Sequence, residues 1–550
     1  MVMNKIVLFV LGLAFFLRIY GLSNHPAGFT PDEASFGYDA YSILRTGRDQ
    51  WGNFFPLSFK SFGDYKMPIY GYLTIPSVAI FGLNEFAVRL PNAILGILAV
   101  LGTYLLVDEV FKDKRTAYLT AFLLAVSSWH ISMSRGAFEA NLTTFFMPFG
   151  IFLFYKGVKN SKYFIWSATF FGLNLFTYHS ARLVTPLIVG YLIVDNRANL
   201  KLSKKMRFPI GIFGLFCIGA LYTYLTGSGS RAVSAGIFSL ASNVGGQRYG
   251  AVMVGLPDFL ARVFNNKLTY LFSIFLGNYV SYFSPQFLFT QGAGEGTYGM
   301  LPGRGLLYLI ELPLLVGFVW GWASGKIKKV NWLVVWLLIA PVPAALSIGP
   351  GYAANRAVIM MPAISIILGL GGVHVFKELA RYIDQKILVF IYLSMFLLGF
   401  VFFIEDYFIQ QPSREAKTMI YGQRELFGYL AQIEGDYHQI IISKKISEGH
   451  VYLSFYNGFD PAEYQSEINS WGFDEGKYSW VDQIPKYTLG KFVFQNIDWS
   501  FHSRVPQVLL VGEPGEFPES TEAIKKILYP NKTEAYWIVA PTQELYANNK

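Results

Sequence analysis

The chain has little charge and almost no cysteine, and each scarcity excludes a class of protein. Only 15% of its 550 residues are Asp, Glu, Lys or Arg, and 53% are hydrophobic. Soluble proteins carry about 25% charged residues, so the composition predicts an integral membrane protein. The single cysteine, Cys217, excludes an intramolecular disulfide and lies inside an apolar run.

Motifs for metals and nucleotides are also missing. The scattered histidines form no His-x-x-x-His or Glu-x-x-His pair, and the glycine-rich run Gln291–Gly296 lacks the spacing of a nucleotide-binding loop. We therefore expect no certain cofactor; a divalent metal stays open, but nothing indicates one. The formal net charge of +9 needs no nucleic-acid partner.

Long apolar runs fill the first two-thirds of the chain. A membrane-spanning helix needs about 20 mainly apolar residues. The sequence predicts about eleven such spans, near residues 5–22, 88–107, 116–133, 140–156, 163–178, 182–194, 208–226, 306–323, 330–347, 357–375 and 387–404. We expect the first to be a retained anchor, because no small-residue cleavage site follows Tyr20.

Lysine and arginine in the short loops predict the orientation. One set of loops holds seventeen of them, whereas the other set holds only Arg135, Arg182 and Arg356. Cytoplasmic loops are the positively charged ones, so the amino terminus should be cytoplasmic. An odd number of spans then places three long segments outside: residues 23–87, 227–305 and 405–550.

The expected fold class is thus a polytopic α-helical membrane protein, residues 1–404, followed by an extracytoplasmic α/β domain, residues 405–550. In the tail, strand-like runs are Gln439–Ser443, His450–Tyr456, Lys491–Gln495, Val508–Val511 and Trp537–Ala540. Helix-like runs are Arg424–Ile433 and Ser520–Leu528.

The first outer segment contains Thr30-Pro31-Asp32-Glu33, which is typical of a helix start. Thr30 can cap the helix, and Glu33 stands at the capping-box position. The following residues predict an amphipathic helix on the membrane surface, with Asp39 on its polar face. Asp32 has two interpretations: a favourable charge at a helix amino terminus, or a carboxylate at the lip of a cavity that accepts a proton.

Isolated cations on the outer side suggest an anionic ligand. Lys66 stands beside a proline-started apolar helix, either as a snorkelling lysine or as a fixed positive charge at headgroup level. The three outer arginines should each have an anionic partner, and the arginine fork matches phosphate geometry. Candidate partners within the protein are Glu139, Asp32 and Asp64. At least one arginine is expected to close only an internal ion pair.

Several short motifs together resemble one superfamily. They are Pro31-Asp32-Glu33-Ala34, a Lys66-Met67-Pro68 element, Arg89-Leu90-Pro91 and Asn355-Arg356-Ala357. Over residues 5–404 the chain resembles the GT-C superfamily. More narrowly, it resembles the branch of protein O-mannosyltransferases and aminoarabinose transferases, glycosyltransferase family 39.

This resemblance implies a glycosyltransferase that moves a sugar from a polyprenyl-phosphate carrier to an acceptor hydroxyl outside the cytoplasm, with inversion. It implies that Asp32 is the catalytic base and that Arg356 contacts the carrier phosphate. The acidic-x-Lys-Pro element corresponds to Asp64, Lys66 and Pro68, with Asp in place of the commoner Glu and Met67 where many relatives have proline. The expected substrate-binding residues are Glu33, Asp64, Lys66, Arg135, Glu139, Arg182 and Arg356.

The implied partners are a polyprenyl-phosphate-linked sugar, the lipid bilayer and an acceptor that is a protein, lipid or glycan. The main alternative is a transporter or flippase of a lipid-linked or anionic substrate. Transporters usually show repeated halves and ionisable groups at the membrane midplane, and the sequence shows no repeat. A sensor whose tail binds a ligand is a third alternative without a supporting motif.

Overall fold

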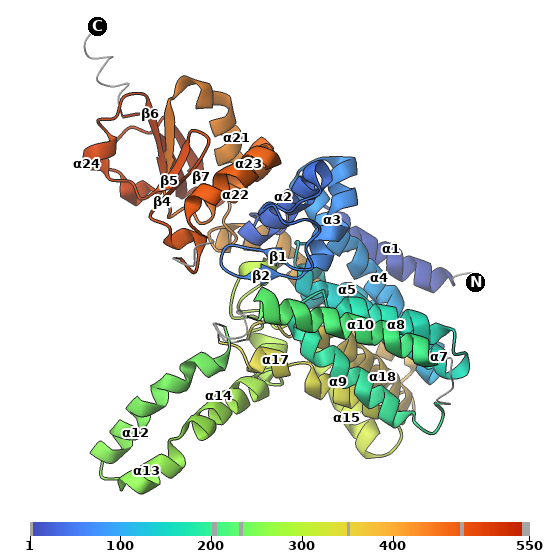
Figure 1. Ribbon diagram of the computed structural model, residues 1–550. Coiled ribbons are helices and arrows are strands. Elements are labelled where there is room, and N and C mark those ends of the chain that lie inside the picture. The colour runs from blue at the N-terminus through green and yellow to red at the C-terminus, as the bar shows by residue number, and fades with distance from the viewer. Residues whose placement is uncertain (1–3, 201–205, 230–234, 349–351, 474–477, 542–550) are drawn as a thin grey trace.

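The computed structural model describes residues 4–200, 206–229, 235–348, 352–473 and 478–541, so Lys201, Lys204 and Lys205 of the basic loops lie outside the described residues. A helical bundle occupies the lower right of Figure 1 and a mixed β-sheet the upper left. Helices α2 and α3 and a small hairpin lie between them. A helical arm formed by α12 (Val244–Met253), α13 (Asp258–Phe264) and α14 (Lys267–Ser281) projects to the lower left.

Each predicted span contains a helix. These helices are α1 (Lys5–Ile19), α4 (Glu85–Phe111), α5 (Lys114–Val126), α6 (Ser128–Ser134), α7 (Thr143–Lys159), α8 (Tyr163–Asn174), α9 (His179–Asp195), α10 (Arg207–Thr223), α15 (Leu312–Ala323), α16 (Asn331–Ile339), α18 (Met361–Leu379) and α19 (Gln385–Glu405).

Fewer helices are long enough to cross a bilayer unaided. Among the described residues, four helical stretches meet that length and hydropathy: Glu85–Phe111, Arg207–Ser228, Val358–Leu379 and Gln385–Arg414. A fifth counts if Ser128–Ser134 and Glu139–Lys159, bent by 118°, form one broken span. The shorter apolar helices fall below the length of a full span, so the total of about eleven stays a prediction.

Helix α2 (Pro31–Thr46) begins as the sequence predicts. The Thr30 side chain accepts from the Glu33 backbone N–H, and the Glu33 side chain accepts from the Thr30 N–H, so the capping box is confirmed. The helix ends at Gly47, whose φ of 73° is left-handed.

The predicted polar face of α2 is not exposed at Asp39. Most of its residues are buried, Asp39 among them, because α3 (Pro68–Phe81) and helix α22 (Gly449–Asn457) of the tail cover it. At Gly37 the approach is so close that an added Cβ would lie 2.5 Å from the Phe455 ring. A polar helix face that looks solvated in the sequence is therefore covered by a segment about 400 residues later.

The tail contains a six-stranded sheet of order β4-β5-β3-β6-β8-β7. Its strands are β3 (Gln439–Ile442), β4 (Lys486–Leu489), β5 (Phe492–Gln495), β6 (Val508–Gly512), β7 (Lys525–Leu528) and β8 (Glu534–Val539). The central strand β3 is parallel to β5 and β6, whereas the other neighbouring pairs are antiparallel.

Two elements of the tail differ from prediction. His450–Tyr456 lies in helix α22, and the end of Ser520–Leu528 is strand β7. Every residue of α22 from Gly449 to Phe455 is buried, so its sequence shows no periodicity that separates a buried helix from a buried strand. The predicted helix over Arg424–Ile433 is α21 (Gln423–Ile433).

The tail and the first outer segment share one apolar core. A single cluster of buried side chains joins Phe29, Phe36 and Tyr70 of the segment to Tyr452 and Phe455 of α22. Hydrogen bonds cross the same boundary: the Tyr452 hydroxyl donates to the Phe29 carbonyl over 2.6 Å, and the Tyr38 hydroxyl donates to the Phe459 carbonyl over 3.0 Å. The tail therefore fixes the position of the residues at the start of α2.

Candidate functional site

An ion pair joins the two strongest candidates. Asp32 is the second residue of α2, and Lys66 ends strand β2 (Tyr65–Lys66), which pairs antiparallel with β1 (Phe59–Lys60). Lys66 Nζ lies 2.8 Å from Asp32 Oδ1. The Lys66 side chain is 2% exposed and the Asp32 side chain 42%. The carboxylate is therefore open to a reactant, while the ammonium group beneath it is held inside the protein.

Aromatic rings make the buried position of Lys66 tolerable. Its Nζ lies 4.9 Å from the ring centres of both Phe36 and Phe62, where ring faces attract a cation. The next residue, Met67, is fully buried, and Pro68 starts α3. The Lys-Met-Pro element thus positions a lysine between a hairpin and a helix start.

Glu33 lies one residue from Asp32 but has a different environment. It is fully buried against Arg89, whose Nε and Nη2 lie 2.8 and 3.2 Å from its two oxygens. The backbone N–H groups of Ala137 and Thr30 also donate to it, over 2.9 and 3.0 Å. Both carboxylate oxygens are already bonded, so Glu33 holds the fold together and is not positioned to bind a substrate.

Two of the three outer arginines bind the protein itself. The Arg135 guanidinium donates to the carbonyls of Leu17, Tyr20 and His25. Arg182 donates to the Leu175 carbonyl and to the hydroxyls of Ser228 and Thr223. Among the described residues no ion pair with a carboxylate is found for either arginine; backbone and hydroxyl oxygens accept from them, and Arg135 Nε has no hydrogen-bond partner.

The third arginine, Arg356, lines a cavity of about 220 Å³ together with Tyr178, His179 and Ser347. Its Nη1 donates to Ser347 Oγ and to the Ile348 carbonyl, both over 2.6 Å. The guanidinium is half-buried. The Arg356 guanidinium therefore supplies a positive charge at the wall of a mainly apolar cavity.

This cavity adjoins the Asp32–Lys66 pair. His179 Nε2 donates to the carbonyl of Tyr65 over 3.1 Å, and Tyr65 precedes Lys66 in strand β2. One hydrogen bond therefore connects a lining residue of the Arg356 cavity to the residue that precedes Lys66.

Asp64 and Glu139 are both half-buried. Asp64 closes the β1–β2 turn, where its carbonyl accepts from the Ser61 N–H over 2.8 Å, so it lies two residues from Lys66. Glu139 opens the short helix η1 (Glu139–Leu142) between α6 and α7. The structure thus groups Asp32, Asp64 and Lys66.

The tail adds two acidic residues that the sequence did not reveal. Glu448 directly precedes α22 and is 6% exposed. Burial, and after it the charge of Asp482, raises the pKa of Glu448 well above its usual value, while the charge of Lys66 lowers it. No spacing or motif marks either residue in the sequence.

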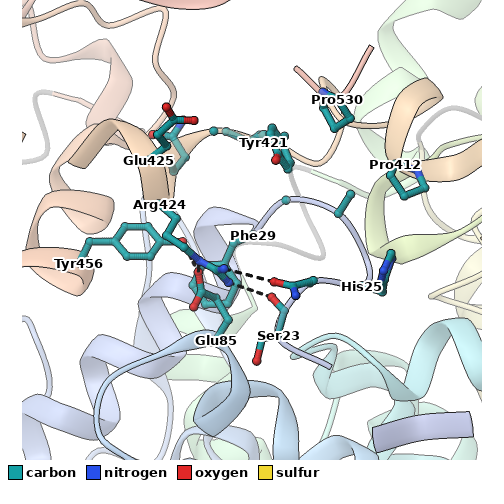
Figure 2. Close-up of a pocket in the computed structure, with 16 residues that line it drawn as sticks. Ser23, His25, Phe29, Glu85, Pro412, Tyr421, Arg424, Glu425, Tyr456 and Pro530 are labelled. Carbon is teal, nitrogen blue, oxygen red and sulfur yellow. Dashed lines mark hydrogen bonds and ion pairs between the residues drawn. The ribbon is translucent and has the colours of Figure 1, made fainter. Parts of the chain in front are cut away.

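A second cavity, of about 310 Å³, lies where the first outer segment meets the tail (Figure 2). Arg424 of α21 spans it, pairing with Glu85 over 2.6 Å and donating to the Ser23 carbonyl over 2.9 Å. Tyr456 also donates to Glu85, over 2.8 Å. Burial lowers the pKa of His25, another lining residue, to about 4, with the charges of Arg135 and Arg89 adding to the effect. An ion pair therefore joins the first outer segment to the tail at the wall of this cavity.

Within the described part of the chain, no group of three or more His, Cys, Asp or Glu side chains could hold a metal ion.

Comparisons with known proteins identify relatives of part of the chain. Residues 66–224 match the family model described as dolichyl-phosphate-mannose-protein mannosyltransferase. The chain is 26% identical over 211 residues to the putative mannosyltransferase YkcB of Bacillus subtilis, which covers 37% of this chain and 28% of that protein.

A shorter match, 34% identical over 116 residues and 20% of each chain, is to the undecaprenyl phosphate-alpha-4-amino-4-deoxy-L-arabinose arabinosyl transferase of Pseudomonas savastanoi. The chain spans less than half the length of the curated relatives that it matches.

The fold has a solved counterpart over nearly the whole chain. The crystal structure of ArnT from Cupriavidus metallidurans bound to undecaprenyl phosphate aligns with 97% of both chains, at a TM-score of 0.54 and 11% identity. The shared fold and the match of residues 66–224 agree with the resemblance that the motifs indicate, and the chain is a multi-pass membrane protein.

Proposed function

Because the chain has a GT-C fold and carries a mannosyltransferase-type segment, we propose that it is a membrane glycosyltransferase. It transfers a hexosyl or pentosyl group from a polyprenyl-phosphate carrier to a hydroxyl of a protein, lipid or glycan on the outer face of the membrane. The observation that carries the proposal is the 2.8 Å pair between the half-exposed carboxylate of Asp32 and the buried ammonium of Lys66.

The reaction is a single displacement at the anomeric carbon. The acceptor hydroxyl gives its proton to Asp32 while its oxygen forms a bond to that carbon. The bond between the carbon and the carrier phosphate oxygen breaks, and the phosphate leaves with the electron pair. Attack opposite the leaving group inverts the configuration.

Lys66 acts on both the base and the leaving phosphate. Its ammonium group lies 2.8 Å from Asp32 Oδ1 and holds the carboxylate in place. The preceding residue, Tyr65, accepts a hydrogen bond from His179, which lines the cavity of Arg356. Arg356 and Lys66 would stabilise the negative charge of the leaving phosphate, and the apolar walls suit the first isoprene units of the carrier.

The orientation and the division of the chain belong to the same proposal. The amino terminus is cytoplasmic, residues 1–404 form the membrane module, and residues 405–550 form an extracytoplasmic domain. The bias of loop charges supports this orientation. The contacts of α22 with α2 support it too, because they require the tail and the start of α2 to lie on one side of the membrane.

The test is single-turnover transfer by purified protein at saturating polyprenyl-phosphate mannose. General-base catalysis contributes about 10²–10⁴ in rate, so Asp32→Asn should slow turnover by about that factor while donor affinity stays within about twofold. If Asp32→Asn retains near-normal turnover, Asp32 is only a helix-start charge and the mechanism fails.

A further inference from the structure

One carboxyl group near the site has no evident structural role. Among the described residues, Glu448 Oε2 is buried without a hydrogen-bond partner. His450 Nδ1 lies 3.8 Å from it, but burial lowers the pKa of His450 to about 3, so this ring is neutral. A buried carboxyl oxygen without a hydrogen-bond partner is costly, and such costs are commonly retained where a ligand supplies the missing bond.

Glu448 belongs to the part of the tail that lies over the hairpin of Lys66. The Val481 N–H donates to the Phe62 carbonyl over 2.8 Å. A Cβ added to Gly63 would lie 2.5 Å from the Ser479 carbonyl oxygen and the Trp480 ring, so the two backbones are in contact. The charges that act on the Glu448 carboxyl include those of Lys66, Asp32 and Asp64.

We propose that Glu448 binds the acceptor, by accepting a hydrogen bond from a hydroxyl or ammonium group next to the hydroxyl that reacts. This inference rests on the proposed function. The tail thereby contributes a specificity-determining residue to a site whose base and phosphate-binding cations belong to the membrane module.

The charges around Glu448 favour an acceptor over the donor lipid. The carboxylates of Asp32, Asp64 and Asp482 would repel a phosphate, whereas they attract a hydrogen-bond donor, and an ammonium group most strongly. The lining of the Arg356 cavity includes His179, which donates to the Tyr65 carbonyl, but does not include Glu448. We therefore assign the donor phosphate to that cavity and the acceptor to the Glu448 side chain.

The first test is thermal unfolding of the purified full-length protein in detergent. Glu448→Gln should unfold at the wild-type temperature or above it, because Oε2 has no hydrogen bond to lose. Glu516→Gln is the matched control: the Glu516 side chain is similarly buried in the tail, but it accepts from Ser443 Oγ over 2.6 Å and from the Glu513 N–H over 2.9 Å. It should unfold at a lower temperature. If Glu448→Gln unfolds as early as Glu516→Gln, Glu448 is structural and the inference is overturned.

The second test separates acceptor from donor. The donor is polyprenyl-phosphate mannose, and the acceptor is a membrane preparation from a strain of the source organism that lacks the gene. A hydrogen bond to a charged group contributes about 1.5–3 kcal/mol, so Glu448→Gln should raise the apparent KM for the acceptor about 10- to 100-fold. Donor affinity and kcat at saturating acceptor should not change.

The outcomes distinguish this inference from the proposed function. Wild-type KM for the acceptor in Glu448→Gln would overturn the inference alone, and so would an equal loss of kcat and donor affinity. In contrast, if the wild-type protein does not consume the donor, the proposed function fails and the inference fails with it.

Discussion

Substitutions of the adjacent residues Asp32 and Glu33 should have different effects, one on turnover and the other on thermal stability. Glu33→Gln removes the charge that opposes Arg89 in a fully buried pair. Breaking such a pair costs about 3–5 kcal/mol. We expect the lower part of that range, because Arg89 keeps its hydrogen bonds to the carbonyls of Leu22, Pro26 and Gly28.

The hydrogen bonds explain why glutamine cannot replace glutamate here. Glu33 Oε1 accepts from Arg89 Nε and the Ala137 N–H, and Oε2 accepts from Arg89 Nη2 and the Thr30 N–H. Whichever oxygen becomes an NH₂ group, that group faces two donors. With an unfolding entropy of about 2.1 cal/mol/K per residue over 550 residues, a loss of about 3–5 kcal/mol lowers the midpoint by about 3–4 °C.

The assay is thermal unfolding in detergent, with single-turnover transfer per folded molecule measured on the same sample. Glu33→Gln should unfold early yet retain most of its turnover. Asp32→Asn should be destabilised less, because the Asp32 side chain is 42% exposed and the amide oxygen can still accept from Lys66, but it should lose turnover. Wild-type unfolding of Glu33→Gln would refute the assignment of Glu33 to the fold. Early unfolding of both variants would show that the two positions are not separable.

Three further predictions follow from the geometry. Arg356→Lys keeps the charge but loses the planar fork, so the Kd for polyprenyl-phosphate mannose should rise about tenfold or more, while Arg182→Lys leaves it unchanged; equal effects would remove Arg356 from the donor site. A topology reporter fused after Lys550 should be active outside the cytoplasm, and one at Lys328 inside; the reverse pattern would overturn the orientation. Gly37→Ala should lower the unfolding temperature and acceptor transfer together, because the new Cβ would lie 2.5 Å from the Phe455 ring.

The control for the last variant is Gly190→Ala in α9, where an added Cβ meets nothing within 4 Å. It should unfold at the wild-type temperature. Equal destabilisation by both alanines would mean that helix context, rather than the contact with Phe455, sets the effect.

Local signals in the sequence predicted the local structure well. The Thr30–Glu33 spacing marked a capping box, and β-branched and aromatic runs marked β3, β5, β6 and β8. The ion pair between Asp32 and Lys66 joins residues 34 positions apart, which no helical or strand periodicity connects. Only the resemblance to a family placed both in one site.

The errors have a common physical cause, which is burial by distant segments. The polar face of α2 looked solvated because α22, which covers it, begins only at Gly449. Arg135 and Arg182 seemed to require anions because backbone carbonyl partners leave no trace in the sequence. The sequence did not reveal Glu448, because the feature that marks it is a buried oxygen without a hydrogen-bond partner, which only the folded chain shows.

The shared core of the first outer segment and the tail also has a consequence for folding during synthesis. Helix α2 is synthesised early, but the side chains of α22 that bury it emerge more than 400 residues later. Until the tail has crossed the membrane, the start of α2 lacks its cover and Asp32 lacks its final surroundings. We therefore expect a chain arrested before Gly422 to leave α2 open to protease, and the finished chain to protect it. Under the proposed function, the protein would stay inactive during its own synthesis.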